Sequence, residues 1–365
     1  MSTLQVTAER LVVVPHPNAD RLELAQVGLY RAVVAKGQFA TGDHAVYIPE
    51  QSVLPEELIA ELGLTGKLAG SLRNRVKAVR LRGEVSQGIV CTPTALGGVD
   101  LAGAAVAGTD FAESLGIVKW VPPVPVSMSG QVESAPDLLR WVDVENIKRF
   151  PDIFTAGEPV VATEKIHGTA CLLTHVRAGD RILVSSKGVG GRSLSLSLTE
   201  ADGNLYWRAV RAHGLDEAAR KLAAALDADR IGLFGEVYGA GVQDLHYGAS
   251  AAHDSSLGFG LFDIAVDAGA APVRWLGHHE ISALLDDLGL ALPRVPVLYE
   301  GGYDAELLLE LAEGAETVSG AGTNIREGLV VRPATERPSP ILGGRAIGKI
   351  VSAAYLLRDG GTEYE

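Results

Sequence analysis

The sequence predicts an α+β protein in which a small N-terminal β-barrel precedes a larger domain of antiparallel sheets with flanking helices. The prediction depends on two observations. Short β-branched runs separated by turn residues fill residues 11–107, whereas strands and helices are mixed afterwards without a regular order. A doubly wound parallel sheet would need strands and helices in regular alternation, so antiparallel sheets are favoured.

The composition is that of an ordinary globular protein. The chain has 365 residues, of which 47% are hydrophobic and 21% charged, and this length allows two or three domains. No uninterrupted apolar stretch of about 18 residues occurs, and the N-terminus lacks the pattern of a secretory signal. The only cysteines, Cys91 and Cys171, do not have zinc-ligand spacing. We therefore expect a cytoplasmic protein with no membrane association and no obligate protein partner.

The elements of the predicted barrel are separated by turn residues. Strands are expected at 11–14, 22–27, 32–35 and 45–48, and a short helix at 56–62. Pro15 stops the first strand, Gly28 separates the second from the third, and Gly63 ends the helix. Several short strands with one helix are typical of a small barrel.

A cluster of basic residues lies in a window that contains no Asp or Glu. Its members are Lys67, Arg73, Arg75, Lys77, Arg80 and Arg82. Residues 75–81 alternate basic and apolar side chains, which predicts a half-buried strand with one cationic face. The net charge of −13 argues against general attraction to nucleic acid, so such binding would need a local patch of this kind. The pattern fits a solvated strand face equally well.

The composition also predicts a connection between two domains. Residues 98–108 are rich in Ala and Gly, and residues 120–130 are rich in Pro. Residues 143–152 are predicted to form a short helix that stops at Pro151. The expected organisation is a barrel domain at 1–112, a linker at 113–142 and a second domain at 143–365.

The second domain is predicted to mix strands and helices. Strands are expected at 160–164, 171–176, 181–185, 231–238, 258–266, 327–332 and 345–351, and helices at 216–226, 277–288 and 304–312. The first helix has an apolar stripe at helical spacing and Asp216 as its candidate cap. Gly289 and Gly314 are expected to end the other two helices.

One lysine of this domain has an unusual setting. Lys165 stands between Glu164 and the pair His167-Gly168, and apolar, partly β-branched runs flank the stretch. The lysine is therefore expected at the end of a strand or in the turn after it, where Gly168 lets the backbone come close to a ligand. Such a lysine is a candidate covalent nucleophile, although most lysines are solvated surface residues.

Four later residues stand inside apolar strands, where charge is costly to bury unless it is paired or bound to a ligand. They are Glu236, Phe262, Glu327 and Lys349. A single charged residue in such a strand is commonly part of a structural salt bridge. Together with Lys165, they give two acids and two lysines in this setting, which indicates a shared site.

The first domain resembles a known family. Residues 16–22, His-Pro-Asn-Ala-Asp-Arg-Leu, and residues 82–89, Arg-Gly-Glu-Val-Ser-Gln-Gly-Ile, are similar to the OB-fold tRNA-binding domain attached to some aminoacyl-tRNA synthetases. The resemblance implies an OB barrel more firmly than it implies tRNA. OB barrels commonly follow nucleic-acid backbones through a basic groove. The nucleic-acid-binding residues expected on this basis are Arg73, Arg75, Lys77, Arg80 and Arg82.

The second domain resembles the covalent nucleotidyltransferases, which include DNA ligases, RNA ligases and mRNA capping enzymes. The matching residues, in order, are Lys165, Lys187, Glu236, Phe262, Glu327 and Lys349. The Lys-x-His-Gly motif is similar to the RNA ligase branch, because DNA ligases and capping enzymes usually carry Asp in place of His167. With the OB-like first domain, the chain resembles ATP-dependent, nick-sealing RNA ligases that carry an N-terminal OB domain.

This resemblance implies an activity, its cofactors and its site residues. Lys165 would attack the α-phosphate of ATP and form lysyl-AMP. The AMP would then pass to an RNA 5′-phosphate. A 3′-hydroxyl would finally be joined to this adenylylated 5′ end, at nicks in RNA-containing duplexes. Lys349 would stabilise the α-phosphate, and His167 would either serve the later steps or only orient a hydrogen bond. The ATP-binding residues would be Glu164, Lys187, Glu236, Phe262, Glu327 and Lys349, and Glu327 would also hold Mg²⁺ or Mn²⁺.

Three positions depart from the family pattern. Ala170 stands where related ligases often have Asn, Ile347 where many have Lys, and Lys187 where others have Arg, which loses bidentate contact. The alternatives are a non-catalytic tRNA- or RNA-binding protein, and a DNA ligase or capping-type nucleotidyltransferase. The joint presence of the two lysines and two acids argues against the first alternative, and His167 argues against the second.

Overall fold

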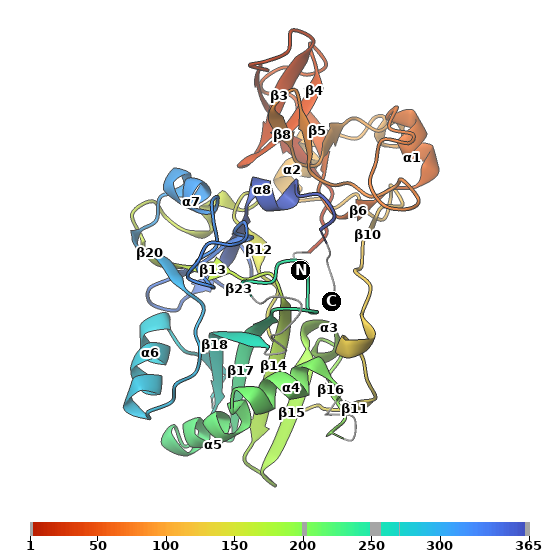
Figure 1. Ribbon diagram of the computed structural model, residues 1–365. Coiled ribbons are helices and arrows are strands. Elements are labelled where there is room, and N and C mark those ends of the chain that lie inside the picture. Colours follow the sequence, from red (N-terminus) through yellow and green to blue (C-terminus); the bar gives the residue numbers. More distant parts are fainter. Residues whose placement is uncertain (1–2, 199–202, 249–256, 270, 362–365) are drawn as a thin grey trace. The chain divides into compact units, whose positions relative to one another are not determined.

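The computed structural model describes residues 3–198, 203–248, 257–269 and 271–361, and in it the chain forms two compact units (Figure 1). The first unit contains residues 1–121 and 145–152, and the second contains 122–144 and 153–365. The predicted domain boundaries at 112 and 143 stay a prediction. No helix in the described part of the chain is both long enough and apolar enough to cross a membrane.

The first unit is built from short antiparallel ladders. β1 (Thr7–Arg10), β5 (His44–Ile48) and β9 (Ile89–Cys91) form one sheet, and β2 (Val12–Pro15), β3 (Leu22–Val27) and β4 (Tyr30–Ala35) form another. Two-stranded ladders join β7 (Val79–Leu81) to β8 (Glu84–Ser86), and β6 (Ser52–Val53) to β10 (Val118–Lys119). Apolar side chains from alternate positions of these strands fill two cores, as half-buried strands require.

The helices of this unit are α1 (Glu56–Glu61), the 3-10 turn η1 (Thr94–Leu96) and α2 (Leu101–Ala107). The expected helix at 56–62 is confirmed. The prediction of a connecting segment at 98–108 was wrong, because the side chain of Asp100 accepts hydrogen bonds from the backbone N–H groups of Ala102 and Gly103 and starts a helix there. Gly108, with a φ of 64°, ends it.

The predicted cationic strand at 75–81 was also wrong, because only Val79–Leu81 is a strand and all three of its residues are exposed. Arg75 instead forms isolated bridges with Val53 and Ala69. Its guanidinium lies 4.0 Å from the ring centroid of Trp120, within cation–π range.

The predicted helix at 143–152 is not formed. The segment contains β12 (Glu145–Asn146) and the 3-10 turn η3 (Pro151–Ile153) instead. The side chain of Asn146 accepts a hydrogen bond from the backbone N–H of Lys148, and the carbonyl of Lys148 accepts one from Leu29 N at 2.8 Å. These bonds commit the backbone to partners outside a helix, which local propensity does not reveal.

The second unit contains two larger antiparallel sheets. One runs, within this unit, in the order β24 (Gly348–Val351), β21 (Gly328–Pro333), β13 (Pro159–Lys165) and β20 (Val297–Gly302). The other runs in the order β15 (Arg181–Ser186), β14 (Thr169–Val176), β17 (Arg230–Tyr238), β18 (Gly258–Asp267) and β19 (Arg274–Trp275). The expected strands are present in both, and the turn at 166–168 joins β13 of the first sheet to β14 of the second.

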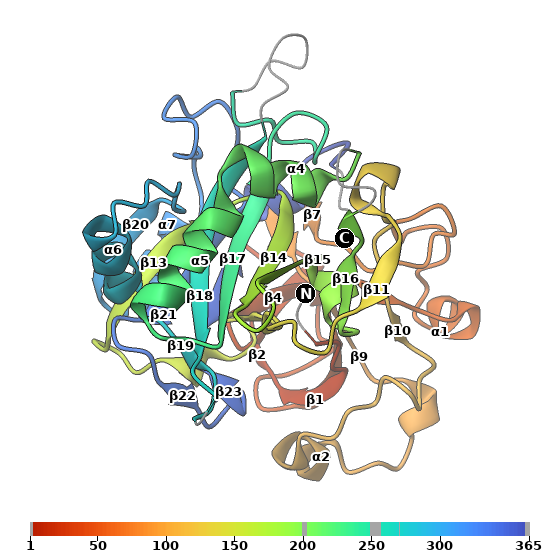
Figure 2. The same cartoon turned by 90° about the horizontal axis from the view of Figure 1, so that it is seen from below.

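The helices of this unit are α3 (Lys187–Gly190), α4 (Leu205–Ala212), α5 (Leu215–Ala225), α6 (His278–Asp287), α7 (Ala305–Leu311) and α8 (Ala353–Leu356). Helices α4 and α5 cover the face of the β14–β17 sheet and bury the largest core of the molecule (Figure 2). The expected helix at 216–226 is confirmed, but its predicted cap was wrong. Gly214, with a φ of 59°, precedes α5, and Asp216 lies inside its first turn.

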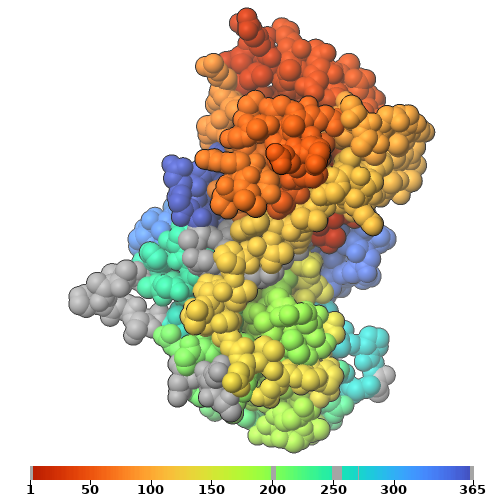
Figure 3. Space-filling model, turned by 90° about the vertical axis from the view of Figure 1, so that its right-hand side faces the viewer, coloured from red at the N-terminus to blue at the C-terminus, as the bar shows by residue number. Residues whose placement is uncertain are grey.

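The segment before β13, residues 122–144, belongs to this unit and adds a strand to it. It contains η2 (Val126–Met128) and β11 (Val132–Ser134), which pairs with β16 (Leu194–Leu196). In the space-filling view this segment, in yellow, lies beside the green residues of β16 and α3 (Figure 3). Near the C-terminus, β22 (Pro338–Ser339) and β23 (Gly344–Arg345) form a short hairpin.

Candidate active site

Lys165 is the last residue of β13, immediately before the turn that joins the two sheets of the second unit. Its Nζ lies 2.7 Å from Oε1 of Glu327, and the lysine side chain is about one quarter exposed (27%) while the glutamate is buried (8%). The expected position of the lysine at a strand end is confirmed. A partly exposed amine next to a buried carboxylate has a fixed direction while remaining accessible.

Glu327 precedes β21 and keeps one oxygen unsatisfied. Its Oε2 is buried and has no hydrogen-bond partner among the residues that the structure describes. A buried carboxylate oxygen without a partner is costly. Gly328 follows with a φ of 150°, and a Cβ there would lie 2.0 Å from the carbonyl oxygen of Ile350. Only glycine therefore lets β21 pass this close to β24 while holding Glu327 beside Lys165.

Glu236 lies on β17 and faces the same group of charges. Burial raises the pKa of its carboxyl group to about 8, and the carboxylate of Glu327 raises it too, whereas the ammonium groups of Lys165 and Lys187 oppose this effect. The backbone N–H of Gly168 donates to the same carboxyl group. A Cβ on Gly168 would lie 2.1 Å from the carbonyl oxygen of Val237, so this position also requires glycine.

Two further lysines belong to this region. Lys187 begins α3, and its Nζ lies 2.6 Å from Oδ1 of Asp143. Burial alone would raise the pKa of Asp143, but the lysine ammonium holds it below its usual range. Lys349 pairs across β24 and β21 with Val330, which pairs with Thr163 on β13. Paired residues share a face of a sheet and so do residues two apart on a strand, so Lys349 and Lys165 lie on the same face.

Phe262 stands at an irregularity of β18. Phe234 pairs with Asp263 and Gly235 pairs with Leu261, so Phe262 is the extra residue of a β-bulge. It remains half-buried in a strand whose interior is otherwise buried, and its ring centroid lies 4.9 Å from that of Trp141. The bulge therefore leaves this aromatic side chain partly exposed.

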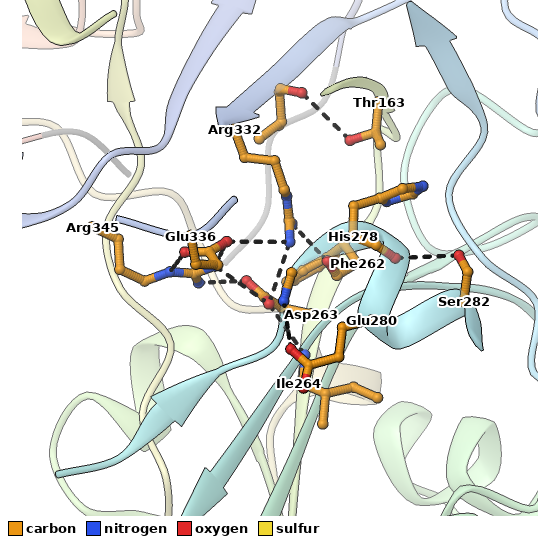
Figure 4. A network of polar contacts seen from close by, with 12 residues as sticks. Thr163, Phe262, Asp263, Ile264, His278, Glu280, Ser282, Arg332, Glu336 and Arg345 are labelled. Atoms are coloured by element: carbon orange, nitrogen blue, oxygen red, sulfur yellow. Dashed lines mark hydrogen bonds and ion pairs between the residues drawn. The ribbon is translucent and has the colours of Figure 1, made fainter. Parts of the chain in front are cut away.

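A network of buried charges lies behind Phe262 (Figure 4). Arg332 Nη2 donates to the carbonyl oxygen of Phe262 at 2.7 Å, and Nη1 lies 3.4 Å from Oδ1 of the fully buried Asp263. Arg345 Nη1 reaches the other oxygen of Asp263 at 2.5 Å and also pairs with Glu336. Two arginines shared by two carboxylates satisfy the buried charges and fix the backbone of the bulge.

Glu164 is not brought together with the other predicted site residues. Glu164 is adjacent to Lys165 on β13, so its side chain points to the opposite face of the sheet. Its Oε2 accepts hydrogen bonds from Thr317, one from the backbone N–H at 2.9 Å and one from the hydroxyl. Burial raises the pKa of Glu164, while the bonds from Thr317 oppose that shift. Its predicted role in ATP binding stays a prediction.

The ring of His167 is buried, and both of its nitrogens are engaged. Nε2 lies 2.8 Å from Oδ1 of Asp244, and Nδ1 lies 2.9 Å from the hydroxyl of Tyr355. Arg358 binds both oxygens of the same Asp244. These three partners were not predicted from the sequence, because none of them lies near a recognisable motif. Trp141 was not predicted either. Asp143 stands in a stretch, Asp-Val-Glu-Asn-Ile, that resembles the family's linker, but no role was predicted for its side chain.

The basic residues of the first unit differ in exposure. Arg73, Arg80 and Arg82 are exposed, whereas Arg75 and Lys77 are half-buried. Their role in nucleic-acid binding stays a prediction. Among the described residues of the whole chain, no group of three or more His, Cys, Asp or Glu side chains is arranged to hold a metal ion.

Fold and site together define the class of protein. A lysine–carboxylate pair lies at the junction of two antiparallel sheets, with a second acid on the neighbouring strand, and this arrangement fits a nucleotidyltransferase of the ligase type. The RNA ligase family matches residues 158–351, more than half of the sequence, and an OB-fold domain matches residues 5–94. The chain belongs to the RNA ligase family. The expected α+β fold, with an OB-fold domain followed by a ligase-like domain, is confirmed.

Solved structures of the Naegleria gruberi RNA ligase are similar to the whole chain. The structure with PPi has a TM-score of 0.75 at 26% sequence identity, and the match covers 97% of this chain and 98% of that chain. A variant with AMP and Mn has a TM-score of 0.76 at 26% identity, over 97% and 98%. Another variant, with ATP and Mn, has a TM-score of 0.76 at 27% identity, over 96% and 98%. No curated protein matches the chain.

Proposed function

We propose that this RNA ligase uses ATP to join an RNA 3′-hydroxyl end to a 5′-phosphate end, through AMP bound covalently to Lys165 and then to the 5′ end. The observation that carries the proposal is the 2.7 Å contact between Lys165 Nζ and Glu327 at the junction of the two sheets. The solved structures of the Naegleria ligase with ATP or AMP and Mn support ATP and a divalent cation as its cofactors.

The first requirement of the reaction is a neutral amine. A free lysine has a pKa of about 10.4 and is almost wholly protonated at neutral pH. Glu327 stabilises the ammonium form in the absence of nucleotide. The ammonium of Lys349, on the same sheet face, favours the neutral form of Lys165 and would stabilise negative charge on the α-phosphate. As the amine attacks phosphorus, the N–P bond forms, the bond to pyrophosphate breaks and pyrophosphate leaves, and the nitrogen loses one proton to water.

The remaining residues bind and orient ATP. Phe262, which is only half-buried, would stack on the adenine. Glu236 would hydrogen-bond to the ribose hydroxyls, and its pKa of about 8 means that the protonated form, which can donate as well as accept, is present at neutral pH. Lys187, held by Asp143 at 2.6 Å, would contact the ribose or an incoming phosphate.

The residues present fit a divalent cation held largely by water and phosphates. Glu327 offers a buried carboxylate oxygen without a hydrogen-bond partner among the described residues, and hard cations prefer oxygen ligands. When bound there, Mg²⁺ or Mn²⁺ would neutralise phosphate charge and withdraw the Glu327 carboxylate from Lys165, which favours the neutral amine. Cations of this kind commonly bind through one or two carboxylates and substrate phosphates, so a larger cluster is not required.

The proposed substrate is a nick in an RNA-containing duplex. The OB-fold domain supports this choice, because such domains bind nucleic acid through basic grooves. Arg73, Arg80 and Arg82 are exposed on this unit and would contact phosphates. We place the reaction in the cytoplasm, with no membrane and no obligate protein partner.

The test is incubation with α-labelled ATP, followed by mapping of the labelled residue. Wild-type protein should become labelled at Lys165, and GTP should not replace ATP. Lys165→Ala should abolish labelling but retain sealing of RNA that already carries AMP at its 5′ end, because that step does not need the lysine. Lys221→Ala removes an exposed lysine that pairs with Glu217 at 2.9 Å and should label normally. Normal labelling of Lys165→Ala would refute the proposal.

A further inference from the structure

We propose that Tyr355, Asp244 and Arg358 are positioning residues that hold the turn after Lys165 through the ring of His167. The proposal rests on the proposed function, because the turn at 166–168 matters only if Lys165 is the nucleophile. His167 then acts as an anchor of the nucleophile rather than as a proton donor or acceptor.

The ring of His167 is fixed from two sides. The 2.8 Å contact with Asp244 requires a hydrogen on Nε2, since a carboxylate only accepts. In the neutral ring, Nδ1 then accepts from the hydroxyl of Tyr355 at 2.9 Å. The two rings also meet edge to face, with centroids 5.2 Å apart. A ring with both nitrogens engaged cannot exchange a proton with a substrate unless one of these contacts breaks.

Arg358 completes the arrangement. Its Nε donates to Oδ2 of Asp244 at 2.9 Å and its Nη2 donates to Oδ1 at 3.1 Å, which is a bidentate pair. Its guanidinium also stacks on the ring of Tyr355, with 3.7 Å between Cζ and the ring centroid. Arg358 therefore fixes the two groups that bind the two nitrogens of His167.

Helix α8 connects the network around His167 to Glu327, the carboxylate that pairs with Lys165. The backbone N–H of Ser352, the cap of α8, donates to the carbonyl oxygen of Glu327 at 2.9 Å. The N–H of Ala353 donates to Glu313 at 2.6 Å, which holds the start of the helix. One short helix thus contacts both the turn after Lys165, through Tyr355, and the backbone of Glu327. It can fix the separation of the amine and the carboxylate.

The backbone of the turn is held as well. The N–H of His167 donates to the hydroxyl of Tyr247 at 2.6 Å. The side chain of Ile166 is buried in a cluster with Tyr247 and Tyr355, against which Leu356 packs. Misplacing a reacting group by about 1 Å can cost about a hundredfold in rate, so a turn fixed at this many points is what in-line attack by Lys165 requires.

The experiment measures single-turnover labelling of Lys165 by ATP and, separately, sealing of pre-adenylylated RNA. The test variants are Tyr355→Phe, Asp244→Asn and Arg358→Met, with Arg358→Lys as the conservative partner. The matched controls are Arg337→Met, which removes a bidentate pair with Glu158 at 2.6 and 2.8 Å, and Tyr299→Phe, which removes a hydroxyl bonded to Gly302.

The test variants should label at least about tenfold more slowly at saturating ATP, with little change in the KM for ATP, because positioning acts on the chemical step. The double variant His167→Gln, Arg358→Met should be no slower than the slower single variant, because both changes release one network. Arg358→Lys should recover part of the rate, and both controls should label like wild type. Rates are measured well below each variant's melting temperature, so that loss of stability does not enter.

Two results would overturn the inference while wild-type protein labels normally. One is that the test variants label as fast as the two controls. The other is that His167→Gln removes a limb of the pH–rate profile of labelling, since an anchor should lower the rate equally at all pH values whereas an acid or base should not. Absence of labelling in wild-type protein would instead overturn the proposed function on which the inference rests.

Discussion

Replacing Glu236 by Gln should stabilise the protein while impairing ligation. The folded pKa of about 8 exceeds the ordinary value of 4.5, chiefly because of burial. An acid whose pKa is raised by folding binds its proton more tightly in the folded state, so the contribution of Glu236 to stability is most favourable below pH 4.5 and becomes less favourable as the pH rises towards 8. One pKa unit corresponds to about 1.4 kcal/mol. Ionisation of Glu236 therefore lowers the free energy of unfolding by about 3 kcal/mol at pH 7, and by an amount that approaches about 5 kcal/mol above pH 8.

Glu236→Gln removes this cost because the amide does not ionise. The assay is denaturant unfolding of the nucleotide-free protein at pH 5, 7 and 9, followed by single-turnover labelling. The gain in stability over wild type should grow from pH 5 to pH 9. Glu158→Gln is a control of opposite sign, because bonds from Arg337 lower the pKa of Glu158, so the loss of its charge should destabilise the protein near neutral pH. A gain that does not change with pH, or a loss at pH 9, would refute the reasoning.

Three further predictions concern Glu327 of the ion pair with Lys165, the glycine that follows Glu327, and the basic residues of the first unit. Glu327→Ala should lower overall sealing at least about a hundredfold in a protein that still folds, as measured by nick sealing and thermal unfolding; near wild-type sealing would contradict the assignment. Gly328→Ala should destabilise the protein and slow labelling, because its Cβ would lie 2.0 Å from the carbonyl oxygen of Ile350; unchanged melting and labelling would show that β21 can move aside. Neutralising the exposed Arg73, Arg80 and Arg82 together should weaken binding to nicked duplex and reduce the salt slope by about 0.9 for each phosphate that is no longer bound; an unchanged slope would remove these residues from the interface.

Elements with strong local signals could be predicted from the sequence. The long strands of the second unit could be predicted because both of their faces are buried, so their sequences are nearly continuous apolar runs. Helix α2 was missed because its Ala- and Gly-rich sequence resembles a linker, although Asp100 caps it. Residues 143–152 were predicted to form a helix that stops at Pro151, but the carbonyl of Lys148 bonds to Leu29 from a distant part of the chain. Local propensity cannot register such a bond.

The residues of the candidate site also differ in whether the sequence predicts them. Lys165 and Glu327 could be predicted because each stands in a short motif whose residues are adjacent in sequence. Asp244 and Tyr355 could not, because they lie 77 and 188 positions from His167 and only folding brings them to its ring. The orientation of Glu164 away from Lys165 follows from the alternation of neighbouring residues along a strand, so it could have been predicted once Lys165 was placed at a strand end.

The contact between Lys165 and Glu327 also governs what the lysine does in the absence of nucleotide. Amines attack acylating agents, aldehydes and other electrophiles only through the lone pair of the neutral form. A carboxylate 2.7 Å away keeps the proton on nitrogen and so withholds that lone pair. Under the proposed function, the resting protein would thereby be protected against adventitious modification of its nucleophilic lysine. Selectivity for the α-phosphate would then begin before ATP binds, because the amine is unreactive at rest.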